Sequence, residues 1–328
     1  MKRDIDYAYA VTRVRANEVT LLSQMDLDQL INADSYKSAM RKLADAGWGD
    51  IEGVTETKYA EYIENYFKKH WDLLVEILKE DIKDLDLLLI KNDMQNLKAA
   101  LKGIISEHAA SDLYAKSTVY DTKDILAAVE EREFRNLPEF MQDPAIEAYE
   151  ILTTTGNGQL ADAVIDKATL EHILVMAKET KVDMLMKIAE RMVATANIKT
   201  ALRCASTKKS ADFISRSIAE CETLDKQALV AAAASGSVDE VLAYVDKTVY
   251  VPCVEEFKKS TSAFEKWCDD LLMECVSGAK FEAFGIAPII AYYIARDAEV
   301  KTVRIILSAK VNNIPADIIR ERVRTLYV

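Results

Sequence analysis

The residues of this chain that could do chemistry are acidic side chains at helical spacing. The first group is Asp269, Asp270 and Glu274 in the stretch DDLLME, and the second is Asp81, Asp84 and Asp86 in DIKDLD. Two facing acidic groups can hold Mg²⁺ over a diphosphate, because magnesium prefers carboxylate and phosphate oxygens as ligands. The second group alternates with lysine, however, and charged runs on helices usually face water. We therefore expect solvated helix faces, and an all-helical magnesium-dependent diphosphate enzyme is the alternative.

Other catalytic residue types form no recognisable pattern. His70, His108 and His172 lack the H-E-x-x-H pattern of zinc proteases, and no glutamate stands three residues before any of them, as in di-iron bundles. We expect ordinary surface or boundary histidines. The stretch TGNG at residues 155–158 lacks the Lys-Ser/Thr of a phosphate-binding loop and predicts a turn. The sequence thus assigns no catalytic residue, no cofactor-binding residue, no cofactor and no metal ligand.

Cysteines and charge limit the compartment and the partners. The five cysteines are Cys204, Cys221, Cys253, Cys268 and Cys275, an odd number without a C-x-x-C pair, which is typical of a reduced, cytosolic protein. The apolar run at residues 285–295 is too short for the roughly 20 residues of a membrane span, and we expect no signal peptide. The net charge of −12 argues against nucleic acid and anionic lipid as partners. A protein partner is expected.

Helix-forming residues dominate the elements that would carry these groups. Only 9 Gly and 5 Pro interrupt a sequence that is 50% hydrophobic and 29% charged, and this composition predicts a nearly all-α fold. Apolar residues recur at intervals of three and four over residues 71–89, 185–202 and 286–307. Each of these stretches is expected to be an amphipathic helix.

One short pattern recurs along the chain at a nearly constant period. It reads NLKAALK at residues 96–102, NIKTALR at 197–203 and EVKTVRI at 299–305, and its first apolar positions, Leu97, Ile198 and Val300, lie 101 and 102 residues apart. After each copy the sequence predicts a further helix that starts behind an acidic residue, in YDTKDILAAV, LDKQALVAAA and PADIIRERV. The period predicts three helical repeats, with boundaries at residues 1–112, 113–215 and 216–328.

Large aromatic side chains could be interface anchors or core residues. They are Tyr7, Tyr9, Trp48, Trp71 and Trp267. Aromatic residues are common at interfaces, but helical units of this size need large apolar anchors of their own. We expect these five to pack in the core.

Three stretches resemble a known family. The opening YAYAVTRVRANEVTLL contains Tyr7, Tyr9, Arg13, Arg15 and Leu21–Leu22, and the middle stretch NDMQNLKAAL contains Asp93, Asn96, Leu97 and Lys98. The closing segment from residue 284 contains Phe284–Gly285, Tyr292, Glu299, Arg304, Lys310, Ile319, Arg320 and Tyr327. Together they resemble the C subunits of A/V-type rotary ATPases, the bacterial and archaeal relatives of the eukaryotic d subunit. Arg296–Asp297 replaces a more usual lysine–glutamate pair, and Val303 a more usual leucine.

The resemblance implies a non-catalytic part of a rotary motor. Members of the family are pseudo-three-fold helical funnels without an active site. Such a protein would be peripheral, on the cytoplasmic face of the membrane rotor ring, where it would couple the central shaft of D- and F-type subunits to the proteolipid ring during ion transport or ATP synthesis. Whether the ion is a proton or sodium stays open. A helical-repeat adaptor for an unrelated cargo is a further alternative.

Overall fold

The computed structural model describes residues 7–106 and 114–328, and these ranges contain helices, turns and loops but no β-strand. The predicted all-α fold is therefore confirmed. The chain divides into two compact units: unit 1 is Met1–Ile82 with Glu255–Val328, and unit 2 is Lys83–Val254. The three predicted repeat boundaries stay a prediction. None of the described helices has a stretch long and apolar enough to cross a membrane.

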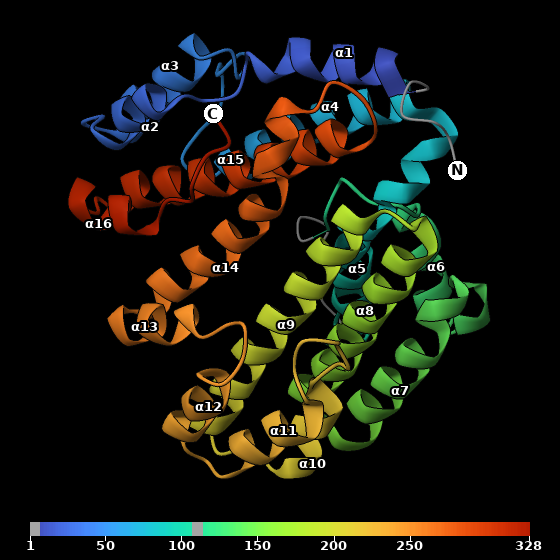
Figure 1. Cartoon of the computed structure of the whole chain (residues 1–328). Coiled ribbons are helices and arrows are strands. Elements are labelled where there is room, and N and C mark those ends of the chain that lie inside the picture. Colours follow the sequence, from blue (N-terminus) through green and yellow to red (C-terminus); the bar gives the residue numbers. More distant parts are fainter. Residues whose placement is uncertain (1–6, 107–113) are drawn as a thin grey trace. The chain divides into compact units, whose positions relative to one another are not determined.

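Unit 1 is built around one long helix, α15 (Ala287–Val311). The other elements are α1 (Ala8–Glu18), α2 (Gln24–Ile31), α3 (Tyr36–Asp45), α4 (Tyr59–Leu78), α14 (Thr261–Val276), η5 (Ser277–Phe281) and α16 (Ala316–Arg322). Helix α15 packs against α1, α3, α4, α14 and α16, and Figure 1 shows it in orange and red below α1. The first and last parts of the sequence thus share one core.

Helix α15 is buried on nearly all sides. Pro288 stands in its first turn, where a missing backbone N–H breaks no helical bond. Apolar residues such as Ile290, Val303 and Leu307 are all within 1% of complete burial, and a helix that is apolar all round belongs in a core. The predicted helical spacing over residues 286–307 is confirmed.

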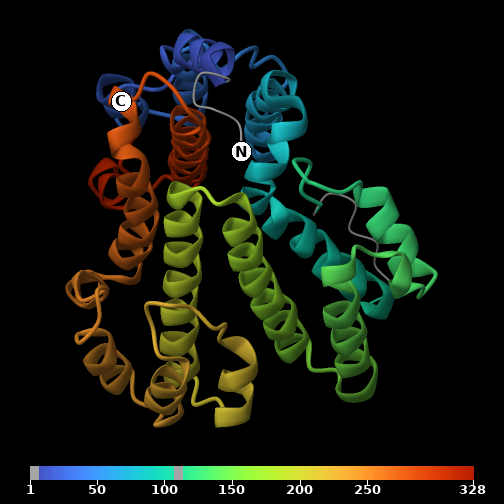
Figure 2. The same cartoon turned by 45° about the vertical axis from the view of Figure 1, so that its right-hand side comes forward.

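Unit 2 is a set of long helices with short helices at their ends. Its elements are α5 (Ile90–Ser106), α6 (Thr122–Glu130), η4 (Phe134–Asn136), α7 (Glu139–Thr155), α8 (Gly158–Thr180), α9 (Asp183–Ser206), α10 (Ala211–Ser217), α11 (Lys226–Ala234) and α12 (Val238–Val245). Helix α8 packs against both α7 and α9, and Figure 2 shows α8 and α9 side by side. The predicted turn at residues 155–158 is confirmed, because Gly156 ends α7 in the left-handed conformation and Asn157 caps α8. Helix α13 (Pro252–Lys259) contains the second boundary between the two units.

The predicted continuous helix over residues 71–89 is wrong. Helix α4 ends at Leu78, Lys79 adopts a positive φ of 53°, and the 3₁₀ helix η2 (Lys79–Leu88) follows. The residues at 87–90 are four consecutive buried side chains. One face of an α-helix cannot bury four neighbours in a row, since its period is 3.6 residues. The break lets the chain bury all four.

Candidate functional site

The acidic group on α14 is not a solvated helix face. Asp269 is 19% exposed at its side chain, and its two oxygens accept hydrogen bonds from Lys301 Nζ at 2.7 Å and Arg324 Nε at 2.6 Å. Asp270 accepts bonds from the backbone N–H and the hydroxyl of Thr325, at 2.8 and 3.0 Å. Only Glu274 is exposed as expected.

These contacts assign a structural role to the two aspartates. Burial raises the pKa of Asp269, but the cations Lys301 and Arg324 together hold it below its usual range. The ionised carboxylate therefore joins α14, α15 and the C-terminal residues 323–328. Asp270 ties the same C-terminal segment to α14. Two of the three carboxylates of the alternative magnesium site, those of Asp269 and Asp270, are therefore engaged by the protein itself.

The second acidic group lies on the 3₁₀ helix η2 rather than on an α-helix. Asp81, Asp84 and Asp86 are all half-buried. Burial, together with the neighbouring carboxylate of Asp93, raises the pKa of Asp86 to about 6. Within residues 7–106 and 114–328, no three or more His, Cys, Asp or Glu side chains are grouped so that they could hold a metal ion.

The histidines differ from one another in their surroundings. His70 is buried in α4, and its Nδ1 lies 2.7 Å from the hydroxyl of Tyr292. The expected surface or boundary position is therefore wrong for this residue. Burial, with a smaller contribution from Arg296, lowers the pKa of His70 to about 3. His172 is half-buried and stacks on Phe140. His108 lies outside the described residues.

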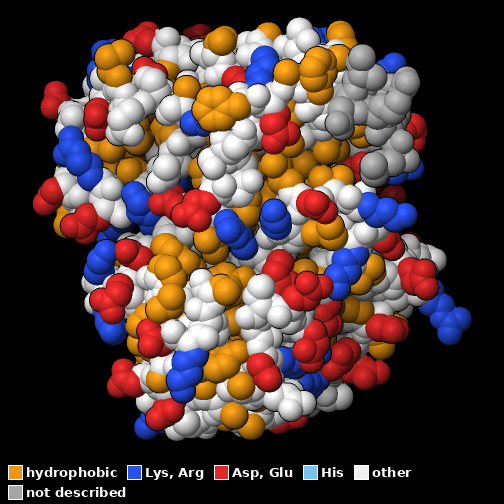
Figure 3. Space-filling view, in the orientation of Figure 1, with side chains coloured by type: hydrophobic (Ala, Val, Ile, Leu, Met, Phe, Trp, Pro, Cys, Tyr) orange, Lys and Arg blue, Asp and Glu red, His pale blue; other side chains and the backbone are white. Residues whose placement is uncertain are grey.

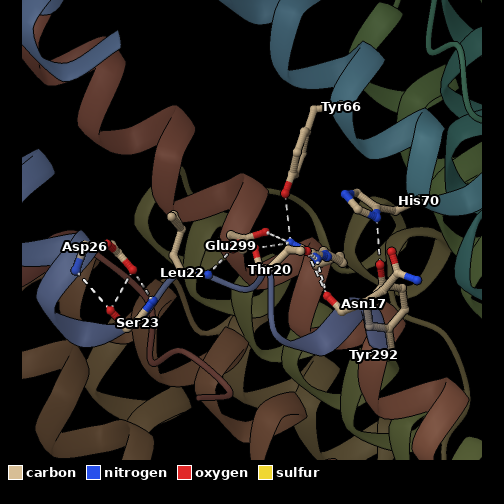
Figure 4. A network of polar contacts seen from close by, with 10 residues as sticks. Asn17, Thr20, Leu22, Ser23, Asp26, Tyr66, His70, Tyr292 and Glu299 are labelled. Atoms are coloured by element: carbon tan, nitrogen blue, oxygen red, sulfur yellow. Dashed lines mark hydrogen bonds and ion pairs between the residues drawn. The ribbon is translucent and has the colours of Figure 1, made fainter. Parts of the chain in front are cut away.

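A buried charge network on α15 joins several elements of unit 1 (Figure 4). Arg296 is 1% exposed and donates from Nη1 to Glu299 at 2.7 Å and to the Tyr66 hydroxyl at 2.8 Å. Its Nη2 donates to the carbonyl of Asn17 at 3.0 Å and to the hydroxyl of Thr20. Charge-assisted hydrogen bonds of this kind are about twice as strong as neutral ones. One guanidinium thereby joins α15, α4 and the end of α1.

Glu299 carries the network to the start of α2. Its Oε1 accepts a hydrogen bond from the backbone N–H of Leu22 at 2.6 Å. The next residue, Ser23, is the N-cap of α2 and forms a capping box with Asp26. Figure 4 shows both contacts beside each other. The carboxylate thus fixes the point at which the chain enters α2.

Aromatic rings surround the guanidinium. Arg296 lies over the rings of Tyr66 and Tyr292, at 5.7 and 5.2 Å from their centroids, and cation–π contacts of this length are favourable when desolvated. Trp48 in turn stacks against the ring of Tyr66, with 3.8 Å between ring centroids. Sequence reasoning noted Arg296 only as a departure from the family. The sequence feature that could have revealed the network is an Arg and a Glu three residues apart inside an otherwise apolar helix.

The aromatic residues predicted to pack in the core differ in their burial. Trp48 and Trp71 are buried, so core packing is confirmed for these two, whereas Tyr7 and Trp267 are half-buried. The ring of Trp267 stacks with that of Phe264. Tyr9 is 62% exposed, which makes the core prediction wrong there. Its hydroxyl instead accepts a hydrogen bond from Arg13, one turn along α1.

The middle stretch that resembles the family contains two side chains, Asp93 and Asn96, that bind backbone groups of the loop before α6. Asp93 on α5 is fully buried and accepts bonds from the N–H groups of Val119 and Tyr120, at 3.1 and 2.9 Å. Asn96 exchanges two bonds with the backbone of Ala115, from N–H to Oδ1 at 2.8 Å and from Nδ2 to the carbonyl at 3.2 Å. These side chains therefore fix the loop that leads into α6.

The second copy of the repeated pattern does the same. Asn197 on α9 exchanges two bonds with the backbone of Ala219, at 3.0 and 2.9 Å. Glu190, on the same helix, accepts the N–H of Thr223 at 2.7 Å. Polar residues on the long helices α5 and α9 thus bind the backbone of loops in the same chain. The role of these hydrogen bonds is structural.

Comparison with known proteins gives a consistent result along almost the whole chain. Residues 10–322 match the family described as ATP synthase (C/AC39) subunit. The C subunit of the A-type ATP synthase of Methanocaldococcus jannaschii is 25% identical over 342 residues, which cover 96% of this chain and 85% of that protein. The C subunit of the V-type sodium ATPase of Enterococcus hirae is 23% identical over 329 residues, covering 96% and 97%. The C subunit of an A-type ATP synthase from Desulfurococcus is 23% identical, covering 96% and 90%.

These matches confirm the resemblance drawn from the three quoted stretches. They also confirm the expectation of a component of an ATPase complex in place of a free-standing enzyme. This chain belongs to the ATP synthase (C/AC39) subunit family.

Proposed function

We propose that this protein is a central-stalk subunit of a rotary A/V-type ATPase and passes torque between the rotating shaft and the membrane rotor ring. The observation that carries the proposal is the family match over residues 10–322, together with relatives matched over nearly their whole length. The protein would carry out no reaction of its own. ATP hydrolysis or synthesis would take place elsewhere in the complex.

The packing of unit 1 supports a mechanical role. A part that transmits torque must resist deformation, and close-packed interiors have low compressibility. Helix α15 is buried over most of its 25 residues. The Arg296–Glu299 ion pair is buried, with both side chains 1% exposed. Through Arg296 it also connects α15 to α1 and α4. Such an element suits the transmission of force better than a mobile binding loop would.

The position of the acidic residues also supports a role without catalysis. Asp269 is held by Lys301 and Arg324, and Asp270 by Thr325. A diphosphate enzyme would need these carboxylates for its metal ions. We propose that these carboxylates hold the C-terminal segment against α14. The enzyme alternative thereby loses its best candidate metal ligands.

The proposed partners follow from the family. They are the D- and F-type subunits of the central shaft on one side and the proteolipid ring on the other, with this protein on the cytoplasmic face of the membrane. An adaptor for an unrelated cargo would differ in its partners alone. Purification from native membranes, with identification of the proteins that accompany it, distinguishes the two.

The role as a coupling element predicts a specific defect when the protein is missing. Complexes that lack only this protein are expected to hydrolyse ATP while transporting few or no ions, because no part connects the shaft to the ring. Ion transport per ATP hydrolysed in reconstituted vesicles is the measurement. Adding back the purified protein should restore transport. Undiminished coupling in its absence would contradict the proposal.

The net charge predicts how the protein is attached. At −12, and with acidic and basic side chains interspersed over the face shown in Figure 3, attachment should depend on ion pairs with basic groups of the partners. Raising the salt from 0.1 to 1 M shortens the screening length from about 10 to about 3 Å, and exposed ion pairs weaken accordingly. Most of the protein is expected in the supernatant after detergent-free salt washing and centrifugation. Retention in the pellet at 1 M salt would indicate an apolar attachment.

A further inference from the structure

Short helices occur in three pairs with the same spacing between their N-cap positions; five of the six N-cap side chains accept a capping hydrogen bond, and Glu133, before the three-residue 3₁₀ helix η4, does not. The N-cap positions are Ser23 and Ser35 for α2 and α3, Asp121 and Glu133 for α6 and η4, and Asp225 and Ser237 for α11 and α12. In each pair the two caps are 12 residues apart, since 35 − 23, 133 − 121 and 237 − 225 all equal 12. Side chains four and eight residues after the first cap are buried in all three pairs: Leu27 and Ile31, Ile125 and Val129, Leu229 and Ala233. The pair α2–α3 is therefore built like the pairs α6–η4 and α11–α12.

The packing partners of two of these pairs also correspond. In unit 2, α12 packs against the long helix α9, and α11 packs against both α9 and the short helix α10 that follows it. In unit 1, α3 packs against the long helix α15, and α2 packs against the short helix α16 that follows α15. Helices α10 and α16 are each 7 residues long. Each begins five positions after its long helix ends, since 211 − 206 and 316 − 311 both equal 5. The pair α2–α3 thus occupies on α15 and α16 the place that α11–α12 occupies on α9 and α10.

The start of each pair is held by a carboxylate of the long helix. Asp93 on α5 accepts the N–H of Tyr120, one residue before the cap of α6. Glu190 on α9 accepts the N–H of Thr223, two residues before the cap of α11. Glu299 on α15 accepts the N–H of Leu22, one residue before the cap of α2. In the first two cases the loop follows its long helix in sequence. In the third case the loop precedes its long helix, and Leu22 lies 277 residues before Glu299.

We infer that residues 19–45 are a strap that completes the packing of the third long helix, α15, and that the contact between Glu299 and the Leu22 amide is its latch. The strap takes the place of the short helix pairs that follow the long helices α5 and α9, which are α6–η4 and α11–α12. The linear division at residues 1–112 would assign this segment to the first repeat instead. The inference rests on cap spacing, packing partners and anchoring bonds within the chain, and it is independent of the proposed role in the ATPase.

The strap has one feature that the other two pairs lack. Its latch carboxylate is paired with a buried cation, Arg296, which also binds the carbonyls of Asn17 and Thr20 just before the strap. At the corresponding positions of the second repeat, 102 residues earlier, stand Ala194 and Asn197. At the position that corresponds to Glu299, the second repeat thus has a neutral amide that bonds Ala219, and its carboxylate, Glu190, stands seven residues earlier on α9. Loss of the latch should release the strap without loosening unit 2.

Amide hydrogen exchange on the full chain tests this inference. In Glu299→Ala, peptides covering residues 20–45 are expected to exchange at least tenfold faster than in the wild type, while peptides of unit 2 keep their rates. Glu190→Ala is the matched variant and should accelerate only peptides around Thr223. Glu265→Ala changes an exposed residue of α14 in unit 1 and should leave all rates unchanged.

A second variant covers the case in which Glu299→Ala does not fold. Arg296→Ala/Glu299→Asn installs the residues of the second repeat and leaves no buried charge unpaired, so it should fold and keep the strap more protected than Glu299→Ala does. Two results would overturn the inference: protection of residues 20–45 that is unchanged in both variants, or loss of protection in unit 2 in step with the strap.

Discussion

Replacing Arg296 with alanine is expected to destabilise unit 1 by about 3–5 kcal/mol, because the change leaves a buried carboxylate without its cation. Arg296 and Glu299 are each 1% exposed at their side chains, so water cannot replace the lost partner. The Tyr66 hydroxyl and the Asn17 carbonyl also lose a hydrogen-bond donor. The free energy of unfolding can be measured by urea titration.

The tryptophans make this measurement specific to unit 1. Trp48, Trp71 and Trp267 all lie within it, so their fluorescence follows unit 1, while far-UV circular dichroism follows the helices of both units. Arg304→Ala is the matched control, since its ion pair with Glu64 is partly exposed and 3.6 Å long, and should cost less than about 1 kcal/mol. Arg296→Met/Glu299→Leu removes both charges and should recover much of the loss. An Arg296→Ala protein within about 1 kcal/mol of the wild type would contradict the assigned role of the network.

The stability of unit 1 is expected to fall as the pH drops below about 6.5. The pKa of His70 is about 3 in the folded chain, because the ring is buried, against an ordinary value of about 6.5 in the unfolded chain. The unfolded state therefore binds a proton that the folded state excludes. The contribution of His70 to stability is complete above pH 6.5 and is lost progressively as the pH falls towards 3. Between pH 7.5 and 5 it should amount to about 2 kcal/mol.

His70→Gln isolates this effect. Glutamine does not titrate and can still exchange a hydrogen bond with the Tyr292 hydroxyl, which lies 2.7 Å from the histidine. The variant should therefore lose about 2 kcal/mol less than the wild type over the same pH range, as measured by tryptophan fluorescence in urea. His172→Gln changes a half-buried histidine of unit 2 and should leave the fluorescence transition unaltered. An unchanged pH slope in His70→Gln would show that another group titrates.

Local patterns predicted the long helices well. The spacing of Leu185, Ile188 and Leu202 located α9, and that of Ile290 and Leu307 located α15, because one helix face buries residues three and four apart whatever lies opposite. The repeated pattern also marked Asn96 and Asn197 correctly as parts of similar elements. Information of this kind is contained in a few consecutive turns of the chain.

Contacts between distant residues could not be predicted in this way. The partners of Arg296 are Asn17 and Thr20, which lie 279 and 276 residues earlier, and no local spacing connects them. The acids of α14 were expected in water because Lys301 and Arg324 cannot be placed beside Asp269 from sequence alone. The break at Lys79 was missed for a related reason. Burial of four consecutive side chains after it depends on neighbours from elsewhere in the fold.

The latch between Leu22 and Glu299 has a consequence for how the protein is made. Its two halves are separated by 277 residues, and ribosomes add about 5–20 residues per second. Helices α1 to α3 therefore leave the ribosome roughly 15 to 55 s before α15 exists. Unit 2 is continuous in sequence, from Lys83 to Val254, and can complete its core during that interval. The first helices to be synthesised are thus among the last to find their place, and the side chains that they bury against α15 stay without that partner until α15 has been made.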